Sequence, residues 1–100
     1  MNSRDGDLAA RVARLDVMAR HRRARDLAAE VDSIRVLADS AGRMPVGAVA
    51  RALERALARG ETGPIVTGWI AMLAEAVGCD RDDPASGAVF LAAGAVRLAG

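Results

Sequence analysis

The chain has 100 residues, of which 52% are hydrophobic, and its formal net charge is +1. This length is typical of one domain, and the apolar content is too high for an intrinsically disordered chain. A net charge this close to zero argues against a domain that binds nucleic acid over its whole surface. We therefore treat residues 1–100 as a single domain.

The use of amino acids is uneven. The chain has no lysine and no tyrosine, every basic residue except His21 is arginine, and the aromatic residues are Trp69 and Phe90. This bias toward alanine and arginine is typical of a GC-rich coding sequence, and we expect a bacterial origin. The single Cys79 cannot form an internal disulfide, which predicts a cytoplasmic, reducing location. The start of the chain, residues 1–7, lacks the apolar run of a secretory signal.

Two apolar stretches occur, at residues 64–77 and 84–96. Each is shorter than the roughly 20 residues that a membrane-spanning helix needs. The acidic segment at residues 80–83 separates them, so they cannot form one span. The sequence therefore predicts no membrane partner.

The first forty residues contain two apolar stripes with helical spacing. The first stripe is Leu8, Val12, Leu15 and Ala19, and the second is Leu27, Val31, Ile34 and Ala38. Leu8 and Leu27 are 19 residues apart, which places the stripes about 100° out of phase on one helix. A single helix over this stretch would be roughly 50 Å long. The pattern favours two helices, near residues 7–20 and 25–41, although no Gly or Pro forces the break.

A third helix is predicted at residues 45–59. One face carries Val46, Val49, Ala50, Leu53 and Leu57. Pro45 suits the first helical position, since its missing N–H has no partner there to lose. Gly60 can take the left-handed conformation that ends a helix.

The fourth predicted helix, at residues 64–78, is apolar around most of its circumference. A helix of this kind is buried on most sides. We therefore expect it at the centre of the fold, with Trp69 as its largest buried side chain.

The fifth predicted helix, at residues 84–98, begins with Asp83 as N-cap and Pro84 in the first turn. One face carries Gly87, Leu91, Gly94 and Leu98. Glycines within a helix lower its stability, so two on one face indicate close approach of another backbone, from this chain or a partner. No strand pattern is present. The sequence predicts an all-α fold, a compact bundle of about five short helices.

A monomer of this size can surround only one helix, yet two successive helices lack a clear polar face. Large apolar patches are rare on monomers. We therefore expect a homodimer or a docked protein partner over the surface that includes Gly87, Leu91, Gly94 and Leu98. The leading functional hypothesis is a small helical interaction or regulatory module that self-associates and has no catalytic activity.

The alternative function is weak nucleic-acid binding through a basic cluster, which consists of Arg20, Arg22, Arg23 and Arg25. Arginine side chains bind phosphates well. However, Asp16, Asp26 and Glu30 lie within one or two helical turns and could pair with these arginines. No aromatic residue is nearby to stack on bases. A solvated charged face is the simpler interpretation, so nucleic acid is not the expected partner.

A more distant alternative is histidine phosphotransfer through His21, because four-helix phosphotransfer domains of this size use an exposed helical histidine. The glycine expected one turn after that histidine is absent. A lone histidine builds neither a metal site nor a catalytic triad. The three aspartates at residues 80, 82 and 83 lack the further ligands of a calcium loop. The sequence thus predicts no catalytic residues, no metal site and no cofactor.

Overall fold

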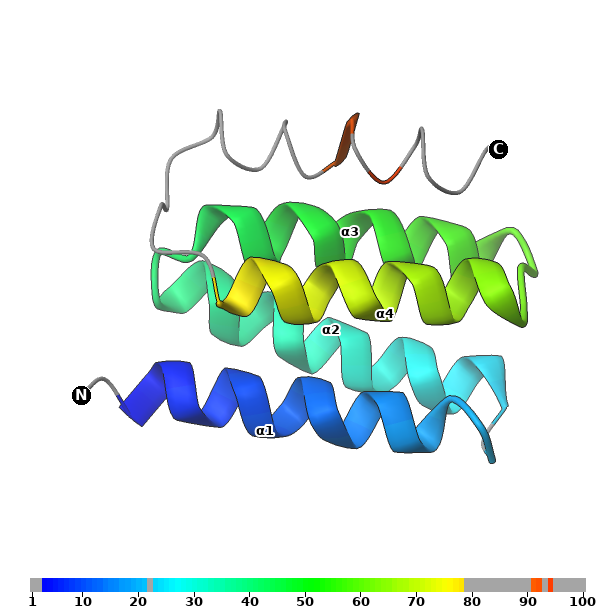
Figure 1. Ribbon diagram of the computed structural model, residues 1–100, viewed down its shortest axis with the longest axis horizontal. Helices are drawn as coiled ribbons and strands as arrows, with labels where there is room; N and C mark the ends of the chain where they lie inside the picture. Colours follow the sequence, from blue (N-terminus) through cyan, green and yellow to red (C-terminus); the bar gives the residue numbers. More distant parts are fainter. Residues whose placement is uncertain (1–2, 22, 79–90, 93, 95–100) are drawn as a thin grey trace.

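The computed structural model describes residues 3–21, 23–78, 91, 92 and 94. It contains four helices in this part of the chain: α1 (Ser3–Met18), α2 (Ala24–Ser40), α3 (Met44–Ala58) and α4 (Pro64–Val77). The helices lie side by side and alternate in direction (Figure 1). Contacts join α1 to α2, α2 to α3, α3 to α4 and α4 back to α1, which closes a ring.

The predicted all-α bundle is therefore confirmed, and the four helices begin and end within a few residues of the predicted positions. The predicted fifth helix, at residues 84–98, lies mostly outside the described residues. Within that segment, Leu91, Ala92 and Gly94 have helical conformation.

The break between the first two helices is confirmed and has a clear local geometry. After α1, the N–H of His21 donates to the carbonyl of Met18 at 3.0 Å, which tightens the last turn. Arg23 then has extended backbone angles, with φ −77° and ψ 159°, and α2 begins at the next residue. The break places both apolar stripes toward the same interior, which one straight helix could not do.

The core consists of the predicted apolar stripes, which meet inside the ring of helices. Its buried members are Leu8, Val12 and Leu15 from α1, Leu27, Val31, Ile34 and Ala38 from α2, Val46, Val49, Ala50, Leu53 and Leu57 from α3, and Val66, Ile70, Met72, Leu73 and Ala76 from α4. Ala19 packs against this core but is only partly buried.

Glycines end two of the helices in the same way. Gly42 and Gly60 have positive φ, at 72° and 81°. The N–H of the next residue reaches back to a carbonyl in the last turn, from Arg43 to Ala38 at 2.9 Å and from Glu61 to Ala56 at 3.1 Å. This is the Schellman arrangement, for which glycine is best suited because it has no Cβ. The predicted role of Gly60 is confirmed.

The expectation that residues 64–78 form a central helix is wrong. Every helix of the ring keeps one side outward, and α3 contributes more buried residues than α4. Trp69 packs against the core but is only half-buried, whereas Met72 and Leu73 are fully buried. The exposed positions of α4 include Ala71 and Ala74 beside Thr67 and Glu75, and these small apolar alanines made the helix resemble an interior one in the sequence.

Gly94 is buried beside the outer side of Trp69. A Cβ at this position would lie 2.9 Å from Cζ3 of Trp69 and 3.4 Å from Cε of Met72. The first distance is shorter than any ordinary contact between carbon atoms. The sequence predicted close approach of another backbone at this glycine, whereas the close neighbours in the structure are the side chains of Trp69 and Met72 from the same chain.

We predict that Gly94→Val destabilises the fold by about 1–3 kcal/mol, since the added carbons overlap the indole ring. Trp69 is the only tryptophan, so a shift of its fluorescence to longer wavelength reports the displaced ring. The control is Gly6→Ala in α1, where an added Cβ meets nothing within 4 Å. It should raise stability by up to about 1 kcal/mol through helix propensity. Unchanged fluorescence in Gly94→Val would contradict this packing.

Arg43, between α2 and α3, is the buried charged residue of the described chain, with 6% of its surface exposed. Its Nη2 donates a hydrogen bond to the carbonyl oxygen of Val77 at 3.0 Å. Val77 is the last residue of α4, where the unpaired carbonyls and the helix dipole favour a cation. Arg43 therefore ties the α2–α3 connection to the end of α4.

We expect Arg43→Met, which keeps the unbranched stem, to lower the free energy of unfolding by about 1–3 kcal/mol. Urea denaturation measures this change. Arg59→Met is the matched control, because Arg59 is exposed and contacts Glu61 at 3.3 Å in a surface ion pair. Its loss should cost less than about 1 kcal/mol. Equal effects of the two substitutions would show that the bond to Val77 adds nothing.

Candidate functional site

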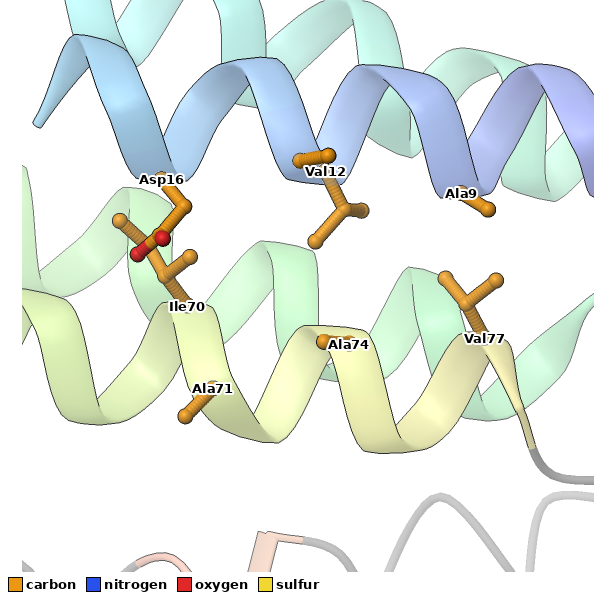
Figure 2. A pocket seen from close by; sticks show the side chains of 8 residues that line it. Ala9, Val12, Asp16, Ile70, Ala71, Ala74 and Val77 are labelled. Atoms are coloured by element: carbon orange, nitrogen blue, oxygen red, sulfur yellow. The ribbon is translucent and has the colours of Figure 1, made fainter.

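An apolar groove runs along the outside of the bundle between α1 and α4, with a volume of about 330 Å³. Figure 2 shows Val12 and Asp16 reaching from α1 toward α4, and Ile70 and Val77 reaching from α4 toward α1. We call this feature the α1–α4 groove. Its lining residues are Ala9, Val12, Ala13, Asp16, Ile70, Ala71, Ala74 and Val77.

The groove follows from the size of the side chains at the seam. Val12 and Ile70 are buried at its floor. The positions that flank them are alanines, which are exposed on both helices. Alanine supports a helix but is too short to fill the space between two helix backbones. The seam is therefore apolar, shallow and open to solvent.

The groove carries little charge and is lined mainly by small apolar side chains. Asp16 is the one charged residue that lines it. Val17, one helical turn after Ala13, has 61% of its surface exposed and is the most exposed large apolar side chain of the described residues. The face thus offers hollows at the alanines and a projecting side chain beside them, which is a setting for helix packing rather than for chemistry.

A second, smaller hollow of about 130 Å³ lies where the α1–α2 and α3–α4 connections meet. Leu27, Leu57 and Val66 contribute apolar surface to it. The hydroxyl of Thr67 on its rim already donates to the backbone carbonyls of Gly63 and Pro64. This hollow has no group arranged for acid–base chemistry.

The predicted basic cluster lies at the α1–α2 connection. Arg20, Arg23 and Arg25 are exposed there, together with His21, and we call these four residues the basic tip. Arg22 is outside the described residues.

The ion pairs expected to neutralise this cluster are absent from the described chain. Neither Asp16 nor Asp26 pairs with a described arginine. Glu30 faces Arg11 instead, with 3.8 Å between Oε1 and Nη1. No hydrogen bond to that oxygen is present among the described residues.

Arg35 and Arg51, by contrast, are paired with acids across the α2–α3 contact. Arg35 of α2 contacts Asp32 on its own helix and donates from Nε to Oε1 of Glu54 on α3 at 2.9 Å. Arg51 of α3 donates to Oδ2 of Asp39 on α2 at 2.7 Å. The hydrogen bonds to Asp32 and Glu54 raise the pKa of Arg35 above its ordinary value. This network joins α2 to α3 and leaves little net charge on their shared surface.

The basic tip also opposes the dipole of α2. Arg23 occupies the N-cap position and makes no side-chain capping bond. Arg25 lies in the first turn, where the positive end of the helix dipole disfavours a cation. Asp26 is the acid of that turn. Neither arginine therefore has a stabilising role that the structure explains.

We predict that Arg23→Asp raises the free energy of unfolding by about 1 kcal/mol, because an aspartate at the N-cap accepts a backbone N–H bond and complements the dipole. Urea denaturation provides the measurement. Arg14→Asp on the exposed side of α1 makes the same charge change away from a helix end. It should be neutral or lower stability by about 0.5 kcal/mol. Equal gains in both variants would assign the effect to net charge.

The remaining predicted site residues separate into two groups. Leu91 is half-buried and Gly94 is buried against α4, whereas Gly87 and Leu98 of the same predicted surface lie outside the described residues. His21 is exposed in a turn rather than on a helix. Residues 80, 82 and 83 are also outside the described part.

Two kinds of site are not found in the described part of the chain. No described group of three or more His, Cys, Asp or Glu side chains could hold a metal ion. None of the described helices combines the length and the apolar character of a membrane span.

Comparison of the chain with known protein families, with characterised proteins and with solved structures gave no match. We therefore describe the chain by the geometry of its described part. It is an antiparallel ring of four helices with an alanine-lined groove on one seam and a basic tip at one end.

Proposed function

We propose that this chain is a small helical interaction module that joins a second copy of itself through the α1–α4 groove and carries out no chemistry of its own. The observation that supports this proposal is the groove, an exposed apolar seam of about 330 Å³ with a single charged lining residue. A surface of this kind gains stability when water is removed from it by another apolar surface.

The argument for a second copy rests on the shape of the face. A two-fold interface has to be complementary to itself, because the same patch is used on both sides. The groove is hollowed at Ala13 and Ala74, and the exposed Val17 lies one helical turn after Ala13, next to the groove but outside its lining, so each copy can supply a side chain that fills the hollow of the other. Only Asp16 would need to keep its access to water.

The sequence led us to expect the second copy on another surface, which consists of Gly87, Leu91, Gly94 and Leu98. Gly94 already packs against Trp69 within the chain. We therefore favour the α1–α4 groove as the docking surface. We also propose, from the single cysteine, that the module acts in a reducing compartment such as the bacterial cytoplasm.

We expect the chain to sediment at equilibrium as a species of twice its 10.4 kDa mass at micromolar concentration. Ala74→Glu in the groove and Val17→Glu beside it should each convert the dimer to the monomer, since a carboxylate buried in the proposed interface has no partner. Both positions are exposed, so the monomer should keep its helical circular dichroism.

Val36→Glu on α2 is the matched control. Val36 is 50% exposed, similar to Val17, but lies away from the groove. This variant should remain dimeric. A wild-type chain that stays at 10.4 kDa up to its highest attainable concentration would overturn the proposal. A dimer that Val36→Glu disrupts and Val17→Glu does not would place the interface elsewhere.

A further inference from the structure

The basic tip has properties that self-association does not explain. It lies at one end of the bundle, where the chain turns from α1 into α2 (Figure 1). We infer that the basic tip, Arg20, His21, Arg23 and Arg25, binds the phosphodiester backbone of nucleic acid without regard to base sequence.

The first argument is the contrast between arginines. Arg11, Arg35, Arg51 and Arg59 each have a carboxylate within 4 Å. The three arginines of the tip have no ion pair with any described acid, although Asp16 and Asp26 are only a few residues away. Arg14 and Arg55 also have no such pair, but they lie on α1 and α3, which do not contact each other, whereas the tip gathers three unpaired arginines at one connection. A guanidinium that is not already paired remains free to form two parallel hydrogen bonds with a phosphate.

The second argument is the position of the tip on the helices. Arg23 and Arg25 stand at the N-terminal end of α2, where they oppose the dipole, and Arg23 fills the N-cap without capping it. An arrangement that costs stability and gives no structural return is expected at sites selected for binding. A bound phosphate would reverse the cost, since the arginines and the positive end of the helix dipole both favour an anion.

The third argument separates nucleic acid from other anionic partners. A membrane-surface segment carries a wide exposed apolar face beside its cations. Near the tip, Met18 and Ala19 are partly buried against the core, and Val17 alone is an exposed large apolar residue of α1 among those described, so no wide apolar face accompanies the cations. Acidic protein segments present scattered carboxylates, whereas a duplex carries one charge per about 1.7 Å along its axis. A narrow cluster of cations on a turn gains most from that dense line of charge.

The tip has no means to read base sequence. The chain contains no glutamine, and its two aromatic residues are Trp69 and Phe90. Trp69 is occupied by its contact with Gly94. Base faces are read by aromatic stacking, and base edges by amide or arginine side chains on a helix or β-ribbon that enters the major groove. The arginines of the tip stand on a turn and a helix end rather than along such an element. Binding is therefore to the backbone, with the same affinity for unrelated sequences.

Fluorescence anisotropy tests this inference with the full chain and labelled mixed-sequence duplex DNA, duplex RNA and single-stranded DNA. Three phosphate contacts predict a slope of about −3 for log K against log salt on duplex DNA. A rise from about 50 to 200 mM salt should then weaken binding about fiftyfold. Equal binding to DNA and RNA supports recognition of the shared phosphodiester, and two unrelated duplex sequences should bind alike.

The decisive comparison uses two triple variants with the same loss of charge. Arg20→Gln, Arg23→Gln and Arg25→Gln together should weaken binding at about 50 mM salt by about tenfold or more and bring the slope of any remaining binding close to zero. Arg11→Gln, Arg51→Gln and Arg59→Gln together remove three ion-paired arginines and should leave affinity within about threefold of wild type. The tip variant should melt no lower than wild type, since its arginines do not stabilise α2.

Three outcomes would overturn the inference: no binding at low salt, equal loss in both triple variants, or binding confined to another polyanion. Vesicles rich in phosphatidylserine and poly-glutamate are the probes for the last case. Binding to either of these with none to nucleic acid would assign the tip to a membrane surface or to an acidic protein.

Discussion

The structure depends on one constraint, which is that each of the four helices has a single apolar stripe to remove from water. The stripes converge on one core, and side chains such as Leu8, Ile34, Leu53 and Leu73 are completely buried there. Connections of only three to five residues separate the helices, so each helix returns antiparallel to the one before it. Burial of four stripes by this route produces a ring in which α4 finally meets α1.

That last meeting brings together the first and last helices of the ring. Val12 and Ile70 turn inward at this seam, and the positions left outside them are mainly alanines. Alanine is compatible with a helix and with water, so neither helix is destabilised by the arrangement. The unfavourable consequence is confined to the seam between the helices, where short side chains leave an apolar groove in contact with water. The proposed docking surface is thus a by-product of the way the ring closes.

The arrangement of the helices also decides which charged residues have partners. Arginines and acids on α2 and α3 face one another across a helix contact and neutralise each other, as Arg35 does with Glu54. Arg43 is buried and donates a hydrogen bond to the carbonyl of Val77 at the end of α4. Arg20, Arg23 and Arg25, at the α1–α2 connection at one end of the bundle, are exposed and have no ion pair with a described acid. A net charge of +1 over the chain therefore conceals a locally basic surface.

The sequence by itself determined the helices, because helix ends and apolar stripes are local properties. The phase slip between Leu8 and Leu27 located the break, and Gly60 and Pro64 marked the boundaries around the third connection. It could not determine which helices become neighbours. Alanines at positions 9, 13, 71 and 74 look like ordinary helix formers until α1 and α4 lie side by side.

Pairing of charges was likewise decided by the tertiary structure. Asp16 and Glu30 have suitable spacing for the basic cluster, but one lies at the groove and the other faces Arg11. The sequence predicted a buried Trp69 because its helix is apolar on nearly every side. In the structure Trp69 is only partly buried against the core. Local patterns fix what a segment is, whereas burial and partners depend on contacts between residues far apart in the chain.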